Sequence, residues 1–136
     1  MGMYRTIVID PAARTVDEVE SEGHRDATAR LVAADHLDYF RLAEHPRSWD
    51  YGYCDERGLA RQRPIHAFLF SIRPDPIAGR CALHGVKKDT GSICDCTFPL
   101  DVIRWEITWL GLVLPRVEWI DTPNGSVAVV SYTALQ

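Results

Sequence analysis

The sequence predicts an α+β fold, with a mostly antiparallel sheet, one main helix, one short helix and a C-terminal β-hairpin. Three observations lead to this prediction. Short apolar runs bounded by turn residues recur along the chain, one segment at about residues 22–34 has helical spacing, and Asn124-Gly125 separates two β-rich runs. With 136 residues, 46% of them apolar, we expect a single domain over residues 1–136 with one core.

The first half of the sequence predicts strands on both sides of the main helix. Ser21 or Asp26 is suited to cap this helix, and Ala27, Leu31 and Ala34 follow at helical spacing. Asp10-Pro11 begins a turn between the first two strands. The strands are expected at residues 4–9, 15–19, 37–42 and 49–53.

The second half predicts further strands and the short helix. Thr97 is expected near the N-cap of a helix at about residues 98–104, with Pro99 in its first turn. Asn124-Gly125 is expected to supply the two positive φ values of a tight hairpin turn. The strands are expected at residues 67–72, 82–86, 92–97, 105–109, 110–114, 116–120 and 127–132.

Charge is distributed unevenly along the chain. The formal net charge is −4, but residues 57–88 contain seven basic side chains and one acidic side chain, a net of +6, so the rest sums to −10. Long nucleic acid is a poor partner for an acidic protein, because its affinity grows with the number of phosphates neutralised. No apolar run approaches the ~18 residues that would span a bilayer. We expect no membrane association and a bacterial cytoplasmic location, with the four cysteines reduced.

The basic region and an aromatic strand together predict a site for a compact anion. Arginines bind phosphate oxygens in bidentate fashion, and aromatic rings stack on a nucleotide base. One alternative is a solvated surface on which the arginines of residues 57–63 pair with Asp55, Glu56 and the acidic N-terminal third of the chain. The alternative for the aromatic strand is a cross-strand ladder. The candidate ligand-binding residues are Arg57, Arg61, Arg63, Arg73, Arg80, Trp49, Tyr51 and Tyr53.

Two alternative sites involve histidine. Cys81, His84, Cys94 and Cys96 have the residue types of a zinc site, although Cys81 and His84 are three residues apart and point to opposite faces of a regular strand. Buried thiols are the simpler interpretation, so we expect no metal and no cofactor. His66 and His84, on two segments expected to be neighbouring strands, would suit a two-histidine phosphodiesterase.

That enzyme class requires a hydroxyl two residues after each histidine. Phe68 and Val86 occupy these positions and supply none. No glycine-rich phosphate loop and no nucleophile motif is present either. The sequence therefore favours a protein that is not an enzyme.

Four short motifs carry a resemblance to a known family. They are Val8-Ile9-Asp10-Pro11, Arg14-Thr15-Val16-Asp17-Glu18-Val19-Glu20, Asp55-Glu56-Arg57-Gly58-Leu59 and Pro76-Ile77-Ala78-Gly79-Arg80. In order and spacing, about residues 4–104 resemble small proteins of unknown function encoded by phages and mobile elements. Arg57 is an insertion relative to that pattern, and residues 105–136 lie outside it. The resemblance implies a phage or prophage origin and a small α+β fold, and no catalytic residues.

These observations leave three hypotheses. The leading hypothesis is a non-enzymatic accessory protein that sequesters a small anionic ligand, with a nucleotide signal as one candidate, in counter-defence. The second is a module that binds or inhibits a host protein. The third is a nucleotide phosphodiesterase using His66 and His84. The apolar strand expected at residues 105–114 also predicts a homodimer formed through an exposed strand edge.

Overall fold

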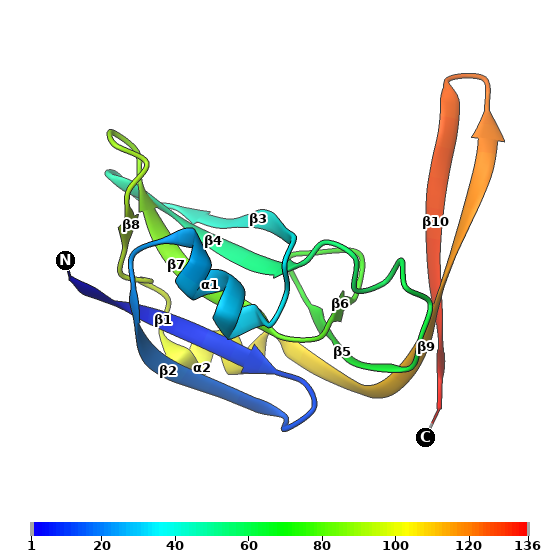
Figure 1. The fold of residues 1–136 in the computed structure, drawn as a ribbon, viewed down its shortest axis with the longest axis horizontal. Helices are drawn as coiled ribbons and strands as arrows, with labels where there is room; N and C mark the ends of the chain where they lie inside the picture. The colour runs from blue at the N-terminus through cyan, green and yellow to red at the C-terminus, as the bar shows by residue number, and fades with distance from the viewer. Residues whose placement is uncertain (1, 136) are drawn as a thin grey trace.

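A computed structural model describes residues 2–135 and arranges them as two antiparallel sheets with two short helices (Figure 1). The six-stranded sheet has the order β2-β1-β7-β4-β3, with β8 also paired to β7, and the four-stranded sheet has the order β10-β9-β5-β6. The elements are β1 (Met3–Asp10), β2 (Thr15–Glu22), α1 (Arg25–Val32), β3 (Leu37–Glu44), β4 (Ser48–Asp55), β5 (Ile65–Phe70), β6 (Ile77–Ala78), β7 (Cys81–Lys87), β8 (Ile93–Cys94), α2 (Leu100–Trp105), β9 (Ile107–Thr122) and β10 (Gly125–Ala134).

The fold class is confirmed in its coarse form: the chain is mostly antiparallel sheet, with few helical residues and two C-terminal strands. The division into two sheets was not expected. Both helices are shorter than predicted, and within residues 2–135 neither is long and apolar enough to cross a membrane.

The start of α1 differs from the prediction because β2 extends further than expected. Ser21 belongs to β2, where its buried hydroxyl lies 2.7 Å from that of Thr6, and Asp26 lies in the first helical turn. His24 is the N-cap instead, and its Nδ1 accepts a hydrogen bond from the main-chain N–H of Ala27 at 3.1 Å. Histidine is not among the residues favoured at the N-cap, so residue preferences did not identify His24 as the cap.

The main core lies between the two sheets. Ile7, Leu83 and other residues of the six-stranded sheet pack against Phe68 and Phe70 of β5, and Ile103 of α2 closes the same cluster. Helix α1 packs on the opposite face of the six-stranded sheet, over β7 and β4 (Figure 1). The sheet is therefore covered on both faces, and five consecutive residues of β7, Cys81–Gly85, are buried.

The return strand expected at residues 92–97 is reduced to the two residues of β8. Beyond Cys94, the chain is held by Arg5 rather than by a regular ladder. The main-chain N–H of Cys96 donates to the carbonyl of Arg5 at 2.9 Å, and Arg5 Nη1 donates to the carbonyl oxygens of Cys96 and Phe98 at 2.7 and 2.8 Å. Thr97 is consequently not the cap of α2, whose N-cap is Pro99.

The C-terminal segment forms one long strand where several shorter ones were expected. Trp105 ends α2, and the 16-residue β9 passes through Pro115 after a bulge at Gly111, whose φ is +73°. Pairing with β5 ends at Val113, so the missing N–H of Pro115 breaks no ladder with that strand. Because β9 lies between β5 and β10, the prediction that residues 105–114 form an exposed edge is wrong.

The hairpin at Asn124 is present, but its turn differs from the expected type. Pro123 and Asn124 form the two-residue loop, and the positive φ of +117° lies at Gly125. The pyrrolidine ring of Pro123 fixes its φ near −65°, which excludes the type I′ turn that needs two positive values.

A buried carboxylate connects the β3–β4 hairpin to the segment after β8. Asp50 is fully buried, and its oxygens accept hydrogen bonds from His45 Nε2 at 2.6 Å and from the N–H and hydroxyl of Thr97. These hydrogen bonds replace the water that the carboxylate loses on burial, and without them burying Asp50 would strongly destabilise the fold. No sequence motif indicated this cluster, because the three residues come from segments up to 52 positions apart.

We expect Asp50→Ala to lower the free energy of unfolding by about 1–3 kcal/mol, because it removes the carboxylate that accepts the hydrogen bonds from His45 and Thr97. The matched control is Asp89→Ala in the exposed β7–β8 turn, expected to change stability by less than about 0.5 kcal/mol. Urea denaturation of the wild type and both variants measures the difference. Equal transition midpoints for all three would show that the Asp50 cluster contributes nothing to stability.

Candidate functional site

A pocket of about 600 Å³ lies on the face of the six-stranded sheet that carries α1. Its walls come from the β2–α1 connection and the first turns of α1, from strands β3, β4 and β7, and from the turn that leads into β8. The lining residues are Gly23, His24, Arg25, Thr28, Leu37, Tyr39, Tyr51, Tyr53, His84, Val86, Gly91, Ser92 and Ile93.

A row of aromatic rings forms one wall of this pocket. The ring centroids of Tyr39 and Tyr51 lie 5.9 Å apart and those of Tyr51 and Tyr53 lie 6.4 Å apart, both edge-to-face. Tyr53 stacks on the imidazole of His84 at 4.5 Å. The alternation of β4 produces this row, since Asp50, Gly52 and Cys54 are buried on the other face. The predicted common face of the β4 aromatic residues is confirmed, and both the ladder and the stacking-platform interpretations fit it.

His84 is held in one neutral form. Its Nδ1 lies 3.2 Å from the carbonyl oxygen of Gly85, which can only accept, so Nδ1 carries the proton. Nε2 then accepts from the hydroxyl of Thr28 at 3.2 Å. Burial lowers the pKa of His84, and the carbonyl of Gly85 and the charge of Asp50 oppose that shift in part. With both nitrogens engaged, His84 acts as a rigid wall of the pocket.

Tyr53 is a neutral phenol in this environment. Burial raises its pKa to about 12, and the neighbouring Tyr51 and Tyr39 act in the same direction. A protonated hydroxyl can both donate and accept a hydrogen bond. The pocket therefore has an apolar stacking wall with a polar edge that stays uncharged at neutral pH.

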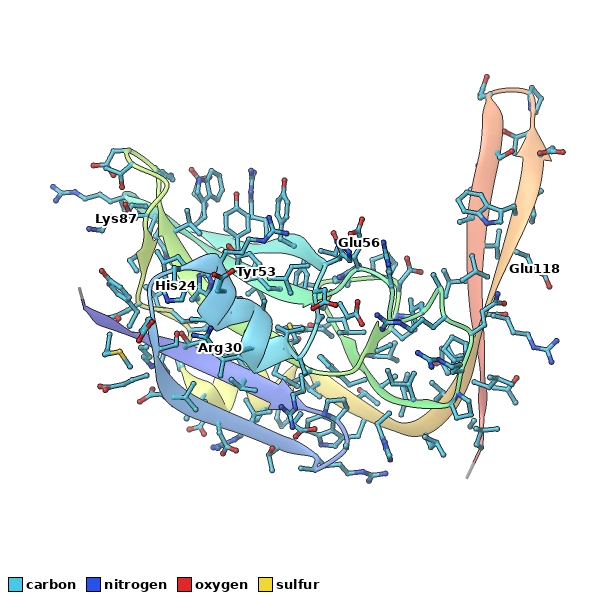
Figure 2. All side chains as sticks on the ribbon, in the orientation of Figure 1. His24, Arg30, Tyr53, Glu56, Lys87 and Glu118 are labelled. Atoms are coloured by element: carbon cyan, nitrogen blue, oxygen red, sulfur yellow. The ribbon has the colours of Figure 1, made fainter. Side chains whose placement is uncertain are left out.

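The opposite wall is formed by the start of α1. Figure 2 shows His24 and Tyr53 on the same side of the sheet, near the N-terminal end of this helix. His24 Nε2 donates to Glu22 at 2.6 Å, which keeps Nδ1 free to cap the helix. Arg25 follows His24 in the sequence, and it supplies a permanent positive charge to the lining of the pocket. The positive end of the helix dipole adds to its charge.

The structure does not bring the five predicted arginines together around one mouth, and none of them lines the aromatic pocket. Arg61 pairs with Asp55, Arg73 with Asp38 at 3.8 Å and Arg80 with Asp10 at 3.5 Å. Arg57 is exposed, and Arg63 shares a smaller cavity of about 330 Å³ with Arg61. The alternative of a paired surface at residues 57–63 describes Arg61, and Arg73 and Arg80 are paired with aspartates as well.

Trp49 shares the face of Tyr51 and Tyr53 but lies outside the pocket lining. The guanidinium carbon of Arg41 is 3.9 Å from its ring centroid, and Lys88 Nζ is 4.7 Å away on the same ring. Two cationic side chains from neighbouring segments therefore already contact the indole ring. Of the eight residues predicted to bind a ligand, the pocket contains Tyr51 and Tyr53.

The zinc arrangement considered for Cys81, His84, Cys94 and Cys96 is not formed. Cys81 and Cys96 belong to the core cluster, whereas His84 faces α1 across the sheet, as the spacing of three residues implied. Burial raises the pKa of the thiols of Cys81, Cys94 and Cys96, that of Cys96 to about 12, which disfavours the thiolate that binds metal. Across residues 2–135, no three His, Cys, Asp or Glu side chains are grouped to hold a metal ion.

The two-histidine arrangement is also wrong. His66 lies on β5 in the four-stranded sheet, opposite Leu112, and His84 lies on β7 in the other sheet. The strands were expected to be neighbours, but the residues that follow the breaker at 73–76 form β6, which pairs with β5, and the chain passes to the other sheet at Gly79-Arg80. His66 and His84 therefore cannot act on one phosphate as a strand pair.

Comparison with protein-family models, with curated proteins and with solved structures gave no match. The resemblance to small proteins of phages and mobile elements thus stays a prediction. Sequence analysis missed His24, Arg25 and Tyr39 as pocket residues. Only Tyr39 carried a usable signal, because it is an aromatic residue within the strand expected at residues 37–42. In the structure it lies directly opposite Tyr53.

We expect His84 to lower the free energy of unfolding as the pH decreases through 6.5, which is the ordinary pKa of histidine. Below that pH the unfolded chain binds a proton that the folded protein, with its lowered pKa, does not, so protonation favours unfolding. Chemical denaturation at pH 7.5 and pH 5.5 should show that the free energy of unfolding decreases less between the two pH values for His84→Gln than for the wild type. The exposed His36→Gln is the control and should retain the wild-type loss. An identical pH dependence in His84→Gln would contradict the buried, neutral imidazole.

Proposed function

We propose that the protein is a non-enzymatic binding protein that holds a small ligand with a planar aromatic ring and an anionic group, such as a nucleotide, in the pocket between α1 and the tyrosine row. The observation that carries this proposal is the lining itself. Tyr39, Tyr51, Tyr53 and His84 form an aromatic wall, and Arg25 lies on the opposite wall of the same pocket.

The size and chemistry of the pocket support this ligand class. A volume of about 600 Å³ falls within the range of small-molecule sites, and such sites are mostly apolar with a few placed polar groups. Aromatic side chains that present a face to a base contribute about 1–3 kcal/mol for each stacked base. The neutral hydroxyl of Tyr53 supplies a donor and an acceptor at the polar edge.

The anionic part of the ligand is assigned to the start of α1. Arg25 offers a guanidinium that can bind a phosphate or carboxylate with two hydrogen bonds. It lies in the first turn of the helix, where the dipole also favours negative charge. This assignment replaces the predicted arginines, three of which are paired with aspartates.

Sequestration of a nucleotide signal in a bacterial cytoplasm, as part of counter-defence, is the physiological role that we propose for this binding. It rests on the sequence resemblance together with the pocket. A binding role is also compatible with His84, whose two nitrogens are both engaged and do not offer a free general base.

The test is calorimetric titration with mononucleotides and cyclic dinucleotides, guided by a thermal-shift screen. We expect Tyr51→Leu to weaken the best ligand about tenfold or more, because it removes a stacking face and keeps an apolar side chain. Arg25→Ala should weaken anionic ligands by a similar factor and leave the corresponding uncharged nucleoside unaffected.

The matched control is Arg57→Ala, which removes an exposed arginine outside the pocket and should leave the affinity unchanged. Loss of binding in Arg57→Ala with full binding in Arg25→Ala would move the site to the predicted arginine region. A wild-type protein that binds no member of the panel would refute the proposed ligand class.

A further inference from the structure

The C-terminal hairpin extends beyond both sheets as an arm. Figure 1 shows the tip of β9 and β10 projecting away from the rest of the protein. Every residue of β10 except the half-buried Val130 is exposed. Trp119 is 71% exposed and Val127 is 50% exposed, so the arm presents large apolar side chains that residues 2–135 do not cover.

One face of the arm is apolar over most of its length. Cross-strand partners share a face, and the pairs Trp119–Ala128, Val117–Val130 and Pro115–Tyr132 follow one another along it. The two charged residues near the middle of the arm, Arg116 and Glu118, lie on the other face. The apolar face continues toward the body as Val113, which is fully buried. The arm therefore prolongs a core-facing surface into solvent.

Among residues 2–135, no strand pairs with the outer edge of β10. The main-chain N–H of Leu135 donates to the carbonyl oxygen of Leu112, and this register alternates along the hairpin. Alternate residues of β10 therefore direct their main-chain groups away from β9. These outward residues are Ser126, Ala128, Val130, Tyr132 and Ala134.

The edge lacks the features with which monomeric proteins prevent strand pairing. Such edges usually carry charged side chains, a proline or a bulge. Asp121 is the last charged side chain of the sequence, and β10 contains neither proline nor an irregularity in its register. At about 3.3 Å per residue, this ten-residue strand offers an edge of about 33 Å.

We propose that β10 is the dimerisation edge of this protein and pairs antiparallel with β10 of a second copy. A two-fold axis at Val130 places Ala128 opposite the partner's Tyr132, so a small residue faces a large one beside Trp119. The outward main-chain groups and most of the apolar side chains of this face belong to the same alternate residues, so pairing them with those of the second copy forms hydrogen bonds and also continues the apolar face.

A second copy fits this edge better than a charged partner. The whole chain carries a net charge of −4, which makes two copies repel each other, but residues 122–136 carry no charged side chain. Identical uncharged strands meet at the two-fold axis without like-charge contacts. In a two-fold dimer the β10 edge of each copy is covered by that of the other, which prevents further association through these edges.

Light scattering coupled to size exclusion tests the assembly, and amide hydrogen exchange on the wild type tests the edge. We expect the mass of two chains and slow exchange at Ser126, Ala128, Val130, Tyr132 and Ala134 that becomes faster on dilution. Val130→Pro removes an outward N–H without affecting the ladder to β9, so it should raise the dimer dissociation constant at least tenfold.

The control is Trp105→Ala, which removes a side chain that is 87% exposed at the end of α2 and should leave the mass of two chains unchanged. Circular dichroism checks that each variant is folded, and the exchange measurement needs no variant. A single-chain mass at all concentrations, assemblies that grow beyond two chains, or fast exchange of the five amides within a dimer would each overturn the proposal.

Discussion

The pairing of β7 on both of its edges is the constraint on which the rest of the structure depends. This strand joins β1 to β4 and also carries β8, and its residues are buried on both faces. Leu83 points into the core between the sheets, and His84 points to α1 and the pocket. A slip of one residue would exchange the two and place the imidazole in the core. The same register therefore fixes the core and the pocket.

Two glycines allow the strands around β7 to approach closely enough to build the pocket walls. A Cβ on Gly85 would lie 2.6 Å from the carbonyl oxygen of Asp95, so glycine lets β8 and the Ser92–Ile93 wall lie against β7. A Cβ on Gly52 would lie 2.3 Å from the ring of Phe40, which packs over this position. That packing fixes β3 on the core side and thereby holds Tyr39 beside the tyrosines of β4 on the other side.

Properties set by neighbouring residues could be predicted from the sequence, and properties set by distant residues could not. The alternation at residues 49–53 identified a strand and its aromatic face because a strand repeats every two residues. The cluster of arginines was visible as well, and Asp55 is near Arg61 in sequence, but the partners of Arg73 and Arg80 lie on strands far along the chain. The choice of sheet for β5 and β7 likewise depends on long-range pairing, which is why His66 and His84 were wrongly placed together.

The pocket and the arm belong to different sheets, and this separation bears on how binding and assembly relate. Every strand that lines the pocket lies in the six-stranded sheet, whereas β9 and β10 lie in the other. A dimer formed through β10 uses none of the lining residues. Coupling between two sites requires an element with two arrangements that both ligands bias. Phe68 and Leu83 are fully buried in the core between the sheets, and no lining residue of the pocket belongs to β9 or β10, so we expect ligand binding and dimerisation to be independent.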